Sequence, residues 1–245
     1  MSNTQPSNGR LVTADMLRDL PEPVQRYMHY TGVLGQPWID TARIKYAGRF
    51  RMAVDKPWMP IRAEQFYTTN PPAFHWKAHF KMAGLWLMTG DDTYKAGHGH
   101  MFGKVAGLYK VVDFHGDELN QGTMLRYLNE MSWFPTAFLG DNITWQAVDD
   151  RSAGVAFTDC GKSVSARIFF DDAGRLTDFV AQRYRENKDS FTLDTWSTPM
   201  TKFGVLGGLN LPVRGQAVWR LPGGDLPYAD LELSEIEYNG PIKAF

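Results

Sequence analysis

Short segments of alternating apolar and polar residues, separated by turn signals, recur along most of the chain and constrain its fold more than any other feature. In the segment 73–82, for example, aromatic residues alternate with histidine and lysine. Side chains of a strand point to opposite faces in turn, so this alternation is typical of strands with one buried face. Asp-Cys-Gly and Asp-Asp-Ala-Gly sequences between such segments are typical of hairpin turns.

One helical pattern interrupts the strands, at residues 117–131. Its apolar residues follow the i, i+3, i+4, i+7 spacing of an amphipathic helix, at Met124, Tyr127, Leu128 and Met131. A shorter pattern at 22–30 predicts an N-terminal helical arm. The sequence therefore predicts a mostly β (α+β) fold, with a large curved antiparallel sheet or half-open barrel wrapped around one or two helices.

Length and charge limit the classes of function. The chain has 245 residues, a net charge of −1 and one cysteine. The balanced charge does not favour nucleic acid, and no apolar run approaches the roughly 18 residues of a membrane span. We expect residues 1–12 to be a disordered N-terminus without signal-peptide features and 13–245 to form a single β-rich ligand-binding domain in the cytoplasm. The oligomeric state stays open.

The helix carries a polar pair, Arg126 and Glu130, spaced one turn apart. Two interpretations stay open: a polar anchor or general base inside the cup, or an ordinary i,i+4 pair at the surface. The direction of the Arg183 side chain, on a later strand, likewise has two interpretations. A cup-facing arginine would suit a carboxylate-bearing ligand, and an outward one would pair with charges on the sheet surface.

The histidines and acidic residues near residue 95 are candidates for a metal site. His98 and His100 share one strand face, but a catalytic zinc site needs a third protein ligand. Strands are expected at 85–89 and 93–104, with a break near Gly90. The sequence Asp91-Asp92-Thr93-Tyr94 then favours a turn or a sheet edge, from which Tyr94 could still donate a hydrogen bond into a pocket. We predict neither a metal nor a cofactor. Nucleotide-binding, P-loop, GxSxG and HExxH motifs are absent from the sequence.

Three segments together resemble a known family. They are 20–27 (LPEPVQRY), 62–67 (RAEQFY) and 126–137, in which RYLNE runs into WFPTA. The chain resembles, from about Leu20 to Tyr238, an uncharacterised bacterial family, a domain of unknown function. Its strand pattern is also similar to the LolA-like lipoprotein carriers, whose half-open antiparallel barrel wraps around helices and holds lipid. Those carriers are exported, whereas this chain shows no signal.

These observations lead to one favoured function and two alternatives. We expect a binder of a hydrophobic or amphipathic small molecule, in which Arg126, Glu130 and Tyr94 make polar contacts. The remaining expected ligand contacts are mostly aromatic: Trp76, Trp86, Tyr127, Trp133, Phe134 and Arg183. The first alternative is a cofactor-free isomerase, lyase or hydrolase that uses Glu130 or a histidine (His98 or His100) as base. The second is a non-catalytic structural or interaction domain with a filled core.

Overall fold

A computed structural model describes residues 9–53, 55–187 and 190–241. The first half contains η1 (Ala14–Leu17), α1 (Glu22–Thr31), β1 (Thr41–Phe50), β2 (Met59–Thr69), β3 (Pro72–Met82), β4 (Leu85–Lys95), β5 (His98–Val105) and β6 (Tyr109–Phe114). After α2 (Asp117–Glu130), η2 (Met131–Trp133) and η3 (Pro135–Leu139) come β7 (Ile143–Asp149), β8 (Ser152–Asp159), β9 (Lys162–Phe170) and β10 (Leu176–Asn187). The last strands are β11 (Ser190–Ser197), β12 (Met200–Leu206), β13 (Leu209–Arg220) and β14 (Leu226–Tyr238).

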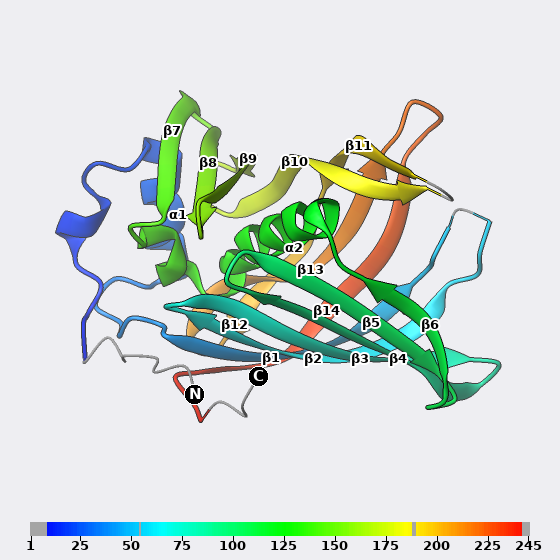
Figure 1. Cartoon of the computed structure of the whole chain (residues 1–245). Helices are drawn as coiled ribbons and strands as arrows, with labels where there is room; N and C mark the ends of the chain where they lie inside the picture. Colours follow the sequence, from blue (N-terminus) through cyan, green and yellow to red (C-terminus); the bar gives the residue numbers. More distant parts are fainter. Residues whose placement is uncertain (1–8, 54, 188–189, 242–245) are drawn as a thin grey trace.

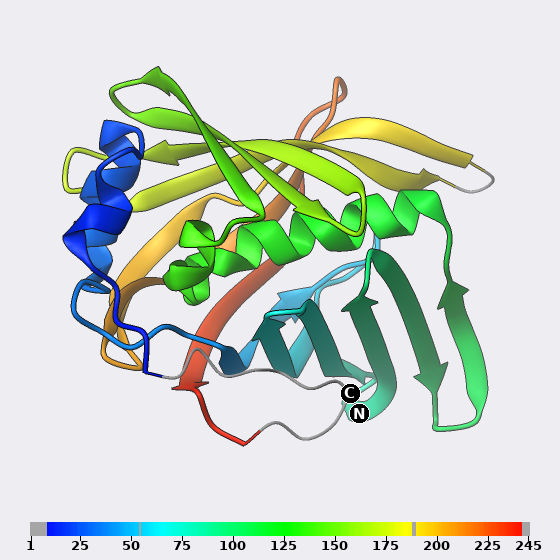
Figure 2. The same ribbon diagram turned by 60° about the vertical axis from the view of Figure 1, so that its left-hand side comes forward.

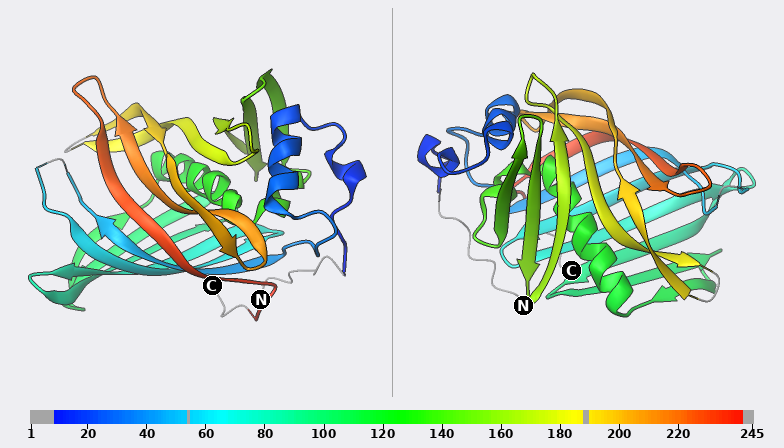
Figure 3. Two further views of the ribbon diagram at one scale, coloured as in Figure 1. Left: turned by 180° about the vertical axis from the view of Figure 1, so that it is seen from behind. Right: turned by 90° about the horizontal axis from the view of Figure 1, so that it is seen from above.

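Within these residues the strands form one 14-stranded sheet (Figure 1). Its order is β6-β5-β4-β3-β2-β1-β14-β13-β11-β10-β9-β8-β7, with β12 paired to β13. The antiparallel pair of β1 and β14 joins the first half of the chain to the second; it runs from Ala42–Tyr238 to Phe50–Ala229, with one bulge between the pairs of Lys45 and Tyr46. Seen from behind, β13 and β14 lie between the strands of the first half of the chain and the other strands of the second half (Figure 3). The predicted curved antiparallel sheet is confirmed.

Helix α2 lies inside the curve of the sheet, between the strands of the two halves (Figure 2). It packs mainly on β5 and β10. Its apolar residues are buried, and the Tyr127 ring lies 5.3 Å from that of Phe157 and 5.8 Å from that of Phe134. Burying these aromatic side chains on both sheet halves fixes the helix in place.

The N-terminal arm closes one end of the curve. Helix α1 has Pro23 in its first turn and ends at Gly32, whose φ of 77° suits glycine. The Tyr27 ring packs 5.7 Å from that of Phe170. The expected disorder of residues 1–12 needs correction: residues 1–8 lie outside the described part, but Val12 is 2% exposed and its N–H donates to the carbonyl of Gln36.

One predicted strand break was wrong. Strand β4 runs without interruption through Gly90, and the turn lies at Ala96 and Gly97 instead. A Cβ atom at Gly90 would lie 3.0 Å from the Trp76 ring, so this glycine makes room for the neighbouring aromatic side chain. The segment with Asp91 and Asp92 is consequently the interior of a strand rather than a turn or edge.

Candidate functional site

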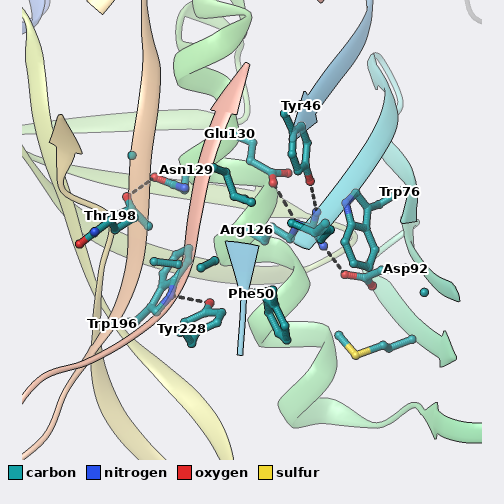
Figure 4. A pocket seen from close by; sticks show the side chains of 18 of the residues that line it. Tyr46, Phe50, Trp76, Asp92, Arg126, Asn129, Glu130, Trp196, Thr198 and Tyr228 are labelled. Atoms are coloured by element: carbon teal, nitrogen blue, oxygen red, sulfur yellow. Dashed lines mark hydrogen bonds and ion pairs between the residues drawn. The ribbon is translucent and has the colours of Figure 1, made fainter. Parts of the chain in front are cut away.

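A cavity of about 270 Å³ lies between α2 and the concave face of the sheet (Figure 4). Its walls are mostly apolar and come from both halves of the chain; they include Phe50, Phe80, Met88, Met101, Phe102 and Leu231. The polar side chains that line it include Asp92, Arg126, Asn129, Glu130, Arg183 and Thr198. An apolar hollow with a few placed polar groups is the usual form of a small-molecule site.

Arg126 is the centre of a buried polar network at this cavity. Its Nη1 donates to Asp92 Oδ2 at 2.6 Å, and its Nε donates to Glu130 Oε1 at 2.9 Å. Its Nη2 donates to Gln65 Oε1 at 2.9 Å and lies 3.3 Å from the hydroxyl of Tyr46. The side chain of Arg126 is 15% exposed. The structure therefore places Arg126 and Glu130 inside the molecule rather than at its surface.

Burial and charge act in opposite directions on this network. Burial alone would lower the pKa of Arg126, but Glu130 and Asp92 outweigh it and raise that pKa well above its ordinary value. Burial raises the pKa of Asp92 to about 6, against the lowering effect of Arg126. Asp92 Oδ1 is buried and has no hydrogen-bond partner among the described residues. Asp92 is thus the least satisfied member of the network.

Aromatic rings complete the surroundings of Arg126. Its guanidinium carbon lies 4.8 Å from the ring centroid of Trp76 and 5.0 Å from that of Phe74. Trp76 and Trp133 both line the cavity, as expected from the sequence. Rings stacked on a guanidinium stabilise its charge where water is excluded.

A second polar group lines the cavity around Arg183, which extends from β10. Its guanidinium carbon lies 4.5 Å from the ring centroid of Trp196 and 5.9 Å from that of Trp219. Its Nη1 donates to the Tyr228 hydroxyl at 3.3 Å. The structure thus places Arg183 toward the cavity. The charge pair on this strand is made by Arg185, which bonds Asp194 at 2.8 Å.

Three expected polar or ligand-lining residues belong to the core instead. The Tyr94 side chain is buried among Phe74, Tyr127 and Phe157, and its hydroxyl donates to Asp159. Tyr127 donates to the carbonyl of Thr68 at 2.7 Å, and Phe134 is fully buried beside Tyr67. These aromatic residues, from β4, from α2 and from the turn between η2 and η3, pack against one another and do not line the cavity.

Three further residues lie on the outer face. Trp86 is 40% exposed and its ring stacks with the Arg62 guanidinium at 4.9 Å. His98 and His100 are exposed, and His100 Nε2 lies 2.9 Å from Asp113 Oδ1. Between them Gly99 faces α2, so strand alternation turns both imidazoles away from the cavity. Among the described residues no group of three or more His, Cys, Asp or Glu side chains is arranged to hold a metal.

Sequence reasoning missed several residues of the site, and Asp92 is the most important. Its strand neighbour in β3 is Trp76, which was correctly expected to face inward. Directly paired antiparallel residues share one face of a sheet. Continuing the alternation of β4 through Gly90 would have placed Asp92 inward. Gln65, Trp196 and Tyr228 gave no comparable signal, since their roles depend on pairing between distant strands.

A family model of unknown function, DUF6544, matches residues 10–231. The chain belongs to this family. The match confirms the family resemblance seen in the sequence, and the family's description assigns no activity. Among proteins with curated descriptions, none matches this chain.

Solved structures show which folds resemble this one. A putative outer membrane lipoprotein-sorting protein domain from Vibrio parahaemolyticus has a TM-score of 0.51 at 8% identity, with 91% of this chain and 93% of that chain covered. A LolA superfamily protein from Nitrosomonas europaea has a TM-score of 0.49 at 12% identity, with 94% and 96% covered. The fold of the Vibrio parahaemolyticus domain agrees with the lipoprotein-carrier architecture expected from the sequence, and at 8% identity the likeness concerns the fold alone.

In the described part of the chain, no helix is both long and apolar enough to cross a membrane.

Proposed function

We propose that this protein binds a hydrophobic or amphipathic small molecule in the cavity between α2 and the sheet. The observation that carries the proposal is the unfilled apolar cavity of about 270 Å³, with its polar side chains grouped around Arg126 and Arg183. Burial of an apolar chain there would supply the binding free energy, and the polar groups would orient the ligand. The hollow interior also argues against a purely structural domain with a filled core.

Similarity of fold supports the same proposal. The Vibrio parahaemolyticus domain is described as a putative lipoprotein-sorting protein domain, and its fold matches over most of both chains. A lipid-like ligand for the present chain agrees with that description. The proposal itself rests on the side chains of this cavity.

A cavity-filling variant tests this function. Ala217 lines the cavity, whereas Ala47 is exposed on β1. We expect the wild-type protein and Ala47→Phe to form a 1:1 complex with lauric acid in native mass spectrometry, and Ala217→Phe to lose most of it. No complex with the wild type, or equal binding by both variants, would contradict the proposal. Circular dichroism of each variant checks that the fold is intact.

A specific observation favours a second candidate, a cofactor-free hydrolase. Asp92 lies at the cavity with its pKa raised to about 6 by burial and with one oxygen unpartnered among the described residues. Such a carboxylate could act as general base toward water. Glu130, the base expected from the sequence, is instead held by Arg126 and by Gln65 at 2.8 Å. Turnover of p-nitrophenyl laurate by the wild type but not by Asp92→Asn would support this candidate; equal rates would remove it.

A further inference from the structure

Arg183 is a cavity-lining cation whose charge lacks a carboxylate partner among the described residues. Its one hydrogen bond there is the long contact of 3.3 Å to the Tyr228 hydroxyl, and its buried Nε has no partner. The other cavity arginine, Arg126, binds two carboxylates. Arg185, two residues along the strand from Arg183, binds Asp194. Arg183 is therefore set apart from both of these neighbours.

The fold keeps Arg183 in this position although it is only partly exposed and its buried Nε without a partner is unfavourable. Helix α2 has a glycine where it passes the side chain, and a Cβ atom at Gly122 would lie 3.3 Å from Arg183 Nε. Glycine within a helix is less stable than alanine, so its presence here has a cost. The stacking of Trp196 on the guanidinium offsets part of the cost of burial.

The Tyr228 hydroxyl provides a second donor beside the guanidinium. It accepts one hydrogen bond from Trp196 Nε1 at 3.0 Å and one from Arg183 Nη1 at 3.3 Å. A phenol oxygen that accepts twice still has its own proton to donate, and among the described residues that proton has no acceptor. Tyr228 itself lines the cavity and is held by its stacked contact with Trp219, at 6.0 Å between ring centroids.

The two cavity carboxylates, Asp92 on β4 and Glu130 on α2, do not bond Arg183. Asp92 is near enough for Arg183 to lower its pKa, but the Asp92 carboxylate is bonded to Arg126. Glu130 is likewise bonded to Arg126. Both carboxylates thus bond Arg126, Asp92 Oδ1 bonds neither arginine, and Arg183 has donors without a bonded anion among the described residues.

We propose that Arg183 and the Tyr228 hydroxyl bind the anionic head group, a carboxylate or phosphate, of the molecule whose apolar chain occupies the cavity. This inference rests on the proposed function and adds the chemical class of the ligand. A guanidinium fork and a neighbouring hydroxyl match the geometry of two oxygens on one anion. The tail would extend toward Met88 and Met101, which line the cavity from β4 and β5.

Three probes with the same twelve-carbon chain test this head-group site: lauric acid, monododecyl phosphate and dodecan-1-ol. Binding is followed by tryptophan fluorescence, since tryptophans line the cavity. We expect Arg183→Gln to weaken the binding of whichever acid the wild type prefers by about tenfold or more, with dodecan-1-ol changed by less than about twofold. The control, Arg185→Gln, should change all three by less than about twofold.

A second variant keeps the test valid if Arg183→Gln does not fold. Tyr228→Phe retains the stacked ring and removes the hydroxyl, and we expect it to weaken acid binding by roughly threefold to tenfold while sparing dodecan-1-ol. The tighter of the two acids identifies the head group as carboxylate or phosphate. Equal losses for all three probes, or wild-type binding of dodecan-1-ol as tight as that of the acids, would overturn the head-group site and leave the proposed function standing. Failure of the wild type to bind any probe would overturn both.

Discussion

Arg126 Nη1 lies 2.6 Å from Asp92 Oδ2, and this ion pair ties helix α2 to the middle of strand β4. The same guanidinium holds Glu130 within the helix at 2.9 Å. One cation therefore bonds two carboxylates whose side chains are 1% and 7% exposed. Charges so deeply buried depend on each other far more than surface pairs do.

Removing Arg126 should be strongly destabilising. We expect Arg126→Met to lower the free energy of unfolding by about 3 to 5 kcal/mol, because two buried carboxylates lose their partner. The control is Arg18→Met, since Arg18 pairs with Asp15 at an exposed position and should cost less than about 1 kcal/mol. Urea denaturation measures both. Similar small losses in the two variants would show that the Arg126 network adds nothing beyond a surface pair.

Asp92 should make stability depend on pH in an unusual direction. Burial raises its pKa to about 6, above the unfolded value of 3.8, so the folded state binds the proton more tightly. The linkage relation then gives a stability contribution that grows as the pH falls from about 7 to about 4. The folded and unfolded pKa values of Asp92 differ by about two units, so its contribution to the free energy of unfolding is roughly 2 to 3 kcal/mol.

The Asp92→Asn variant isolates this contribution from other titrating groups. Urea denaturation at each pH gives the free energy of unfolding of the wild type and of Asp92→Asn. We expect the difference, wild type minus variant, to increase as the pH falls from 7 to 4. A difference that is flat, or that decreases on acidification, would mean that the pKa of Asp92 is not raised in the folded protein.

The approach of β5 to α2 depends on a glycine. A Cβ atom at Gly99 would lie 2.5 Å from Thr123 Oγ1 and 2.8 Å from Thr123 Cγ2. We expect Gly99→Ala to cost about 1 to 3 kcal/mol, and to cost less in a Thr123→Ala background, which removes both atoms. Gly204→Ala, whose nearest contact would be 3.5 Å, is the matched strand control. A cost for Gly99→Ala that does not depend on residue 123 would contradict this account of the contact.

Alternation in the sequence predicted the sheet because most strands bury one face. It failed for β6 and β12, which the sequence did not predict. These strands lie at the margin of the sheet and are largely exposed, so little burial enforces a pattern of apolar residues. The break expected at Gly90 failed for another reason: the glycine is required by the Trp76 ring across the strand pair, which a single-strand pattern does not contain.

The candidate site was predictable where it lies on one element and not where it joins several. The i,i+4 spacing of Arg126 and Glu130 is local, so the sequence identified the pair. The partners Gln65 and Asp92 come from β2 and β4, and their approach depends on the curvature of the sheet. Tyr127, the one aromatic residue of α2, was expected in the cavity but points to the packed side of the helix. The cytoplasmic location and the single-domain boundaries stay predictions.

A crystal structure with 12-bromododecanoic acid tests the central claim most directly, because anomalous scattering locates the bromine at the end of the chain. The account predicts a bromine peak inside the cavity, near Met88 and Met101, with the carboxylate beside Arg183. A bromine peak on the outer face of the sheet, or an empty cavity in crystals saturated with the acid, would contradict it.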